Sequence, residues 1–137
     1  MRRGWNGGWL PLVLLALLVP ASPRAATTIT VGAGDSLQAA INAAQPGDVI
    51  LLAPGATFRG NFALPNKGPG TQFITIRTGG TDPNLPAPGA RVGPGHASLL
   101  ATIRSSNTMT ALRTEPGAHH WRLELLQFAG NQRGYGD

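Results

Sequence analysis

The stretch GDSLQAAINAAQPGDVILLAPGATFRG, residues 34–60, decides the fold. Apolar residues recur at i, i+3, i+4 and i+7 from Leu37 to Ala44, which predicts a short helix with one apolar face. We expect the Asp35 carboxylate to cap the first turn, with Gln38 at the capping-box position three residues on. This half of the stretch therefore predicts a short capped helix with a single buried side.

A buried strand follows that helix directly. Pro46-Gly47 ends the helix, because proline breaks helical hydrogen bonding and glycine suits the turn that follows. Val49–Leu52 is then apolar without alternation, as expected for a strand that is covered on both faces. Pro54-Gly55 turns the chain away. A helix that leads straight into a buried strand predicts a lid over the end of a stack of strands.

Residues 1–25 have the pattern of a secretory signal peptide. A pair of arginines precedes the apolar run Leu10–Val19, which has signal-peptide length and is short for a membrane span. Small residues offer cleavage sites at Ala21 or Ala25. We expect a secreted, periplasmic or cell-surface protein that is free of the membrane once the signal is cleaved; the alternative is an uncleaved N-terminal anchor.

Composition favours an all-β fold and argues against nucleic-acid binding. The chain has 137 residues, a net charge of +5, no cysteine, 19 glycines, 12 prolines and only 12% charged residues. Without residues 1–25, eight basic and six acidic residues remain, a net charge of +2, and the basic residues form no cluster. Stability must come from packing, because an exported chain without cysteine has no disulfides. Many turns and few charged helical surfaces indicate strands.

The predicted strands recur along the chain at a nearly regular interval. Ile29 and Ile50 are 21 residues apart, and Ile50 and Ile74 are 24 apart. A repeat of this length with one main buried strand each time is typical of a solenoid. The strands that we expect are Thr28–Val31, Val49–Leu52, Phe73–Arg77, Leu100–Arg104, Ala111–Thr114 and Trp121–Phe128.

Between the third and fourth predicted strands lies the excursion GGTDPNLPAPGARVGPGH, Gly79–His96. Its prolines favour extended, semi-rigid backbone, so we expect a surface loop inserted between two strands. The alternative is that the loop forms one wall of a binding groove, because long loops on a rigid scaffold often carry recognition.

The sequence resembles the N-terminal end of right-handed parallel β-helix proteins, and most closely the chondroitinase B and alginate lyase group of polysaccharide lyases. The matching segments are Ser36–Ile41, Pro46–Leu52, Pro54–Gly60, Phe73–Thr78 and His119–Phe128. The resemblance implies a parallel β-helix solenoid over residues 26–137, with an N-terminal capping helix and the first few coils. It implies a parent activity that cleaves an acidic polysaccharide. Leu125 stands where that group often has a glycine at a strand bend; with a bend, Trp121, Leu123, Leu126 and Phe128 could all face inward.

Enzymes of this group continue for many more coils, and their calcium ligands and basic catalytic residues lie in those coils. The resemblance therefore implies a truncated N-terminal portion without catalytic residues, and with calcium only in a full-length parent. An uncapped last coil exposes apolar core and strand edges, so we expect self-association there.

Few residues in the chain suggest chemistry. The acidic residues are scattered singly and predict no calcium site. His119 and His120 are adjacent, so on a strand they should point to opposite faces and not share a metal. Lys67, the only lysine, lies in a predicted turn without an evident partner. We therefore predict no catalytic residue and no metal ligand.

Four arginines are the candidate substrate-binding residues: Arg77, Arg104, Arg113 and Arg122. Each follows an apolar residue that should point inward, so each should point outward. Arginine pairs with carboxylate and sulfate groups through two parallel hydrogen bonds, so a row of arginines could hold an anionic glycan. The alternative is a solvated outer face.

Three functions remain open from the sequence. The first is a lyase-like protein that lacks its catalytic coils. The sequence does not decide whether this chain is itself an enzyme. The second is a non-enzymatic β-helix, either a surface scaffold or a glycan-binding module. The third is a small complete protein that pairs its open end with another chain.

Overall fold

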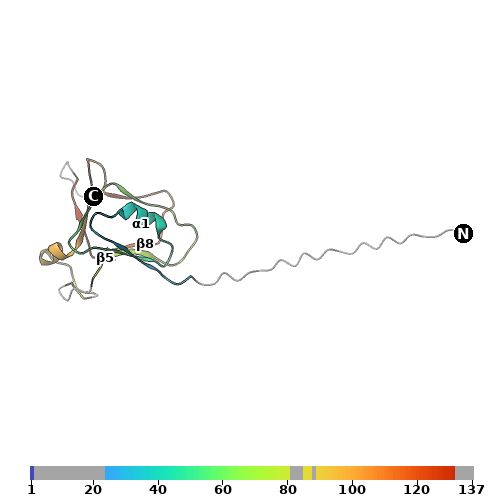
Figure 1. Cartoon of the computed structure of the whole chain (residues 1–137), viewed down its shortest axis with the longest axis horizontal. Helices are drawn as coiled ribbons and strands as arrows, with labels where there is room; N and C mark the ends of the chain where they lie inside the picture. Colours follow the sequence, from blue (N-terminus) through green and yellow to red (C-terminus); the bar gives the residue numbers. More distant parts are fainter. Residues whose placement is uncertain (2–23, 81–84, 88, 132–137) are drawn as a thin grey trace.

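A computed structural model describes residue 1 and residues 24–80, 85–87 and 89–131 (Figure 1). The predicted signal peptide and its Ala21 cleavage site fall on residues outside this set, apart from Met1, Arg24 and Ala25. Among the described residues, no helix is long and apolar enough to cross a membrane.

Short parallel strands make up most of the regular secondary structure among the described residues. They form three sheets: sheet A with the order β1-β2-β5-β8, sheet B with β3-β6-β9, and sheet C with β4-β7. Every strand pair is parallel. In chain order the elements are β1 (Thr28–Val31), α1 (Leu37–Ala43), β2 (Val49–Leu52), β3 (Thr57–Arg59), β4 (Phe62–Leu64), β5 (Ile74–Thr78), the 3₁₀ helix η1 (Pro94–Leu99), β6 (Ala101–Arg104), β7 (Leu112–Thr114), β8 (Trp121–Glu124) and β9 (Leu126–Ala129).

The chain visits the three sheets in a fixed order. β2, β3 and β4 belong to sheets A, B and C in turn, and β5, β6 and β7 repeat that sequence. β8 and β9 then add to sheets A and B. The repeats that begin with β2 and with β5 therefore each supply three short strands to separate sheets. A closed, right-handed solenoid stays a prediction.

The core is built from rows of apolar side chains that run across the strands. In sheet A, Ile29, Ile50 and Ile76 align, as do Phe58 and Ile103 in sheet B. Ile50, Ile76 and Ile103 are fully buried, and burial of each such side chain contributes about 1.5–3 kcal/mol. The 21-residue spacing from Ile29 to Ile50 corresponds to a strand pair. The 24-residue spacing from Ile50 to Ile74 does not correspond to a strand pair, because Ile50 pairs with Ile76, two residues further on.

The predicted strand Trp121–Phe128 is broken into β8 and β9 at Leu125. Leu125 has φ of +49°, in the left-handed region, so the chain bends there without the glycine that usually permits this conformation. The register aligns Leu123 with Ile76 and Phe128 with Ile103, in the inward rows. Their side chains remain 41% and 39% exposed.

Helix α1 begins differently from the sequence-based expectation. Gly34, with φ of +95°, turns the chain so that Ser36 becomes the N-cap and accepts from the Ala39 N–H at 3.2 Å. The Asp35 carboxylate instead accepts from the Gly32 N–H at 2.8 Å. The predicted Asp35 cap is therefore wrong by one residue, and Gln38 is free for another contact.

That contact ties α1 to the edge of sheet C. The Gln38 amide accepts from the Ala63 N–H at 2.9 Å and donates to the Ala63 carbonyl oxygen at 3.0 Å. It thus satisfies the same backbone groups that a further strand would pair with. The predicted apolar face is confirmed, with Leu37, Ala40 and Ile41 buried. Figure 1 shows α1 inside the outline traced by the surrounding strands, as expected for a lid.

Asp48 holds the turn between α1 and β2. Its side chain is 1% exposed and accepts from the backbone N–H groups of Thr27 and Gln45, both at 2.9 Å. Arg24 Nη1 donates to Asp48 Oδ2 at 3.2 Å. Burial raises the pKa of the Asp48 carboxyl, but the hydrogen bonds from Gln45, Thr27 and Arg24 outweigh it, so the net shift is downward.

Asparagines join successive bends between sheets B and C. The Asn61 Nδ2 donates to Asn107 Oδ1 at 3.2 Å, and the Asn107 Nδ2 donates to Asn61 Oδ1 at 2.9 Å. Ser105 is buried here and accepts from Asn61 Nδ2 at 3.1 Å. In the next bend, Asn131 Nδ2 lies 3.5 Å from the Thr108 carbonyl oxygen. These contacts hold one bend against the next.

Candidate functional site

The outward face of sheet A brings together two of the four candidate arginines. The parallel register places Arg77 beside Glu124 and Thr75 beside Arg122. Glu124 lies between the two guanidinium groups, 3.9 Å from Arg77 Nη1 and 3.8 Å from Arg122 Nε. Both distances exceed those of direct hydrogen bonds, so these ion pairs are loose.

Arg122 has a second contact that orients it. Its guanidinium carbon lies 4.5 Å from the centroid of the Phe73 ring, which is a cation–π contact. Phe73 is itself 43% exposed. The arrangement holds the guanidinium above the sheet while half of the Arg122 side chain remains open to solvent.

A groove lies along this face. We call it the sheet A groove; its volume is about 420 Å³, and it is lined by Arg77, Pro86, Ala87, Gly89, Ala90, Glu124 and Leu125. A neighbouring hollow of about 510 Å³ shares Arg77 and is lined also by Val49, Leu51, Thr78, Gly79 and Gly80. The described residues of the excursion Gly79–His96 therefore form one wall of a groove, while its residues 81–84 and 88 lie outside the described set.

The other two candidate arginines lie elsewhere. Arg104 is exposed on sheet B, where it aligns with Arg59. Arg113 is exposed on sheet C, beside Ala63. The four therefore occupy three different sheets and form no single row. Sequence reasoning did not single out Arg59, although Thr57-Phe58-Arg59 has the same pattern as Thr102-Ile103-Arg104.

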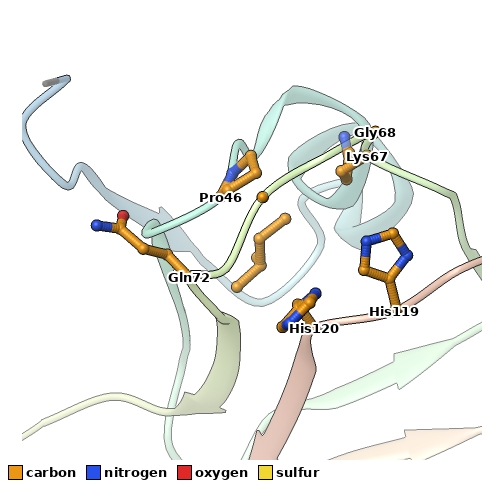
Figure 2. Close-up of a pocket in the computed structure, with 8 residues that line it drawn as sticks. Pro46, Lys67, Gly68, Gln72, His119 and His120 are labelled. Atoms are coloured by element: carbon orange, nitrogen blue, oxygen red, sulfur yellow. The ribbon is translucent and has the colours of Figure 1, made fainter. Parts of the chain in front are cut away.

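The two adjacent histidines line a separate pocket, shown in Figure 2 and called here the lysine pocket. His120 has φ of +58°, so the chain is not extended there and the expectation of opposite faces is wrong. The His119 and His120 rings instead meet edge to face, with centroids 4.8 Å apart. The pocket is lined by Pro46, Lys67, Gly68, Gly70, Gln72, Ile74, His119 and His120.

The lysine pocket is too small for a sugar. Its volume of about 10 Å³ admits roughly one water molecule, and the buried Nδ1 of His120 has no hydrogen-bond partner among the described residues. Burial lowers the pKa of the Lys67 ammonium, while the charge of Asp48 raises it in part. Lys67 Nζ donates to the Asn42 carbonyl oxygen at 2.7 Å, so it caps the last turn of α1. These contacts give Lys67 a structural role.

Within residues 24–80, 85–87 and 89–131, no three histidine or acidic side chains come together to hold a metal ion. The acid and base groups needed for sugar cleavage are likewise not gathered in the sheet A groove, where Glu124 is the acidic side chain and Arg77 the basic one. The chemistry that this groove supports is the binding of an anion beside an apolar wall.

Comparisons with known proteins give one informative similarity. No protein-family model matches the chain, and no curated protein matches it. Among solved structures, the chain is similar to an alginate lyase from Paenibacillus sp. str. FPU-7, with a TM-score of 0.55 and 28% sequence identity. The match covers 77% of this chain and 30% of the lyase. It supports a relationship to polysaccharide lyases, which is the general part of the resemblance seen in the sequence.

Proposed function

We propose that this chain forms the opening coils of an exported, right-handed parallel β-helix related to polysaccharide lyases, and that its sheet A groove binds an acidic polysaccharide. One observation carries the binding proposal: Arg77 and Arg122 lie beside a groove on the outward face of a chain that is similar to an alginate lyase.

The parallel pairing supports the β-helix part of this proposal. Ile50 in β2 and Ile76 in β5 pair with one circuit of the chain between them, and this circuit passes through sheets B and C, as does the circuit from β5 to β8. A chain that returns in this way to the same three sheets stacks one circuit on another. The cap formed by Gln38 on Ala63 suits the first circuit of such a stack.

The contacts of Glu124 explain how a glycan carboxylate would enter. Glu124 is 3.8–3.9 Å from both guanidinium groups and 38% exposed, so water screens these pairs and they contribute little stability. A uronate carboxylate could therefore replace it as the partner of Arg77 or Arg122 with two short, parallel hydrogen bonds. Pro86, Ala87 and Leu125 offer apolar surface to the sugar ring.

We assign no catalytic step to the described residues. Cleavage of a polyuronate by β-elimination needs a group that neutralises the carboxylate, a base for the α-proton and an acid for the leaving oxygen. The sheet A groove offers the first of these in Arg77 and lacks an evident pair for the other two. In a longer protein, catalysis and calcium binding would belong to other coils. We predict no unsaturated-uronate absorbance when the purified chain is mixed with alginate or dermatan sulfate; its appearance would contradict this assignment.

A non-enzymatic scaffold or glycan-binding module is the second candidate. The hydrogen bonds between Asn61 and Asn107 at the bends favour it, because they serve the stacking of circuits and not any reaction. A glycan-binding module would share the sheet A groove with the first candidate and differ from it only in whether a longer protein cleaves the bound polymer, whereas a scaffold would bind no glycan there.

Calorimetric titration with alginate oligomers tests the binding site. We expect Arg77→Gln and Arg122→Gln each to weaken binding about tenfold, because a hydrogen bond to a charged group contributes about 1.5–3 kcal/mol. Arg113→Gln is the matched control, since it removes the same charge from an exposed position on sheet C. Equal affinity of all three variants and the unmodified chain would refute the assignment of the site.

A further inference from the structure

A second pair of arginines lies on sheet B, away from the sheet A groove. The parallel register aligns Arg59 directly with Arg104, and Thr57 with Thr102. Both arginines are exposed, while the apolar residues before them, Phe58 and Ile103, are buried. The alternation therefore fixes both guanidinium groups on the outward face of the same sheet, on neighbouring strands about 4.8 Å apart.

These two arginines have no acidic partner in the described part of the chain. The ion pairs found there involve Arg24, Arg77 and Arg122, and neither Arg59 nor Arg104 takes part in one. The contrast with sheet A is clear, because Glu124 stands between the arginines there and no acidic residue occupies a strand position in sheet B. The positive charge of the sheet B pair is therefore less neutralised by neighbouring acidic side chains than that of the sheet A pair.

The surroundings of the pair are polar and open. Beside it runs a row formed by Thr57, Thr102 and Gln127, in which Thr102 Oγ1 donates to Gln127 Oε1 at 3.3 Å. A hollow of about 240 Å³ adjoins Arg59 and is bounded by the turn before α1. Asp35 lines that hollow, but its carboxylate accepts from the Gly32 N–H at 2.8 Å and makes no ion pair with Arg59.

Like charges directly beside one another on neighbouring strands are destabilising. An anion held between the two guanidinium groups would reverse that effect, because each guanidinium can pair with a carboxylate through parallel hydrogen bonds. A polymer that carries one carboxylate per sugar can place anions on both arginines while its hydroxyl groups meet the threonine row.

We propose that the outward face of sheet B, defined by Thr57, Arg59, Thr102, Arg104 and Gln127, is a second binding surface for a carboxylate-bearing polysaccharide, which lies across the strands. The inference takes its ligand class from the proposed function and adds a different surface. Binding of a longer chain at both surfaces would raise its apparent affinity beyond that of a short oligomer.

The test compares three variants in titrations with alginate oligomers: Arg59→Gln/Arg104→Gln, Arg77→Gln/Arg122→Gln, and the control Arg113→Gln. A short oligomer should occupy one site fewer in the sheet B double variant than in the control, and a long alginate chain that spans both surfaces should bind at least about tenfold more weakly. Normal affinity of the sheet B variant together with lost affinity of the sheet A variant would overturn this inference and leave the proposed function intact. The reverse result would support sheet B and refute the sheet A groove, and no binding by the unmodified chain would refute both.

Dextran sulfate in place of alginate distinguishes sulfate from carboxylate recognition. Equal losses of affinity for both polymers in the sheet B double variant would overturn the assignment to carboxylates.

A second measurement does not depend on any polysaccharide. Because Arg59 and Arg104 repel each other in the free chain, Arg104→Gln should raise the thermal unfolding midpoint at low salt, and the gain should shrink as salt screens the charges. Arg113→Gln should show no such salt-dependent gain. Equal behaviour of the two variants would remove the physical basis of the inference.

Discussion

The contact between Gln38 and Ala63 makes a sharp prediction about the lid. Gln38→Ala removes the acceptor for the Ala63 N–H and the donor for the Ala63 carbonyl oxygen, and Ala63 is only 9% exposed. Each lost hydrogen bond lowers the free energy of unfolding by about 1 kcal/mol, and the higher helix propensity of alanine offsets a few tenths of a kcal/mol of this loss. The free energy of unfolding should therefore fall by about 1.5–2 kcal/mol.

Urea denaturation followed by circular dichroism measures this change from the shift of the midpoint. Gln45→Ala is the matched control, because the same truncation at an exposed position should change stability by less than about 0.5 kcal/mol. Gln38→Glu refines the test. Its carboxylate still accepts from Ala63 but repels the carbonyl oxygen, so its deficit should shrink as the pH approaches about 4.3 and the side chain becomes a donor. Equal stability of Gln38→Ala and Gln45→Ala would refute the idea that Gln38 closes the edge of sheet C.

Three further predictions follow from single contacts. Asp48→Asn should lower the free energy of unfolding by about 2–3 kcal/mol at neutral pH, because an amide cannot accept from every donor around it. Because the pKa of Asp48 is lowered in the folded state, the stabilisation by its carboxylate is present above about pH 4 and is lost as the pH falls through the folded pKa. Unfolding followed during acid titration should show this loss in the parent chain and not in the variant. At Leu125, with φ of +49°, an isoleucine variant should be about 1–2 kcal/mol less stable than a glycine variant by thermal unfolding, and the opposite order would exclude a left-handed bend. Exposed Leu123 and Phe128 should promote self-association, so sedimentation should detect oligomers that a Leu123→Gln/Phe128→Gln variant lacks; a strictly monomeric parent chain would contradict this.

Local signals account for what could be predicted from the sequence. The apolar spacing from Leu37 to Ala44 located α1 within one residue at its C-terminal end, and the uninterrupted run Val49–Leu52 gave β2 with its observed bounds. Both depend on side chains that are close in sequence. The spacing of the apolar residues could not fix the register, because Ile74 and Ile76 lie two residues apart and are both buried, so either could align with Ile50.

The remaining differences between the sequence-based predictions and the structure come from contacts between residues that are distant in the sequence, or from unusual backbone conformations. Gln38 lies three residues after Asp35, which suggested a capping box, but its amide bonds to Ala63, 25 residues away. His120 was expected to point away from His119, and a positive φ placed both rings in one pocket. The neighbourhood of Arg59 and Arg104 depends on strand register, and the long excursion between β5 and β6 hides that register in the sequence.

The most direct test of the central claim, that the chain binds an acidic polysaccharide through carboxylate groups, is a titration with two forms of one polymer. Alginate and carboxyl-reduced alginate of equal length differ in charge and share their sugar backbone. The account predicts that the chain binds alginate with an affinity that falls as salt increases, and that it binds the reduced polymer at least about tenfold more weakly. Equal affinity for the two polymers, or no binding to alginate at low salt, would contradict it.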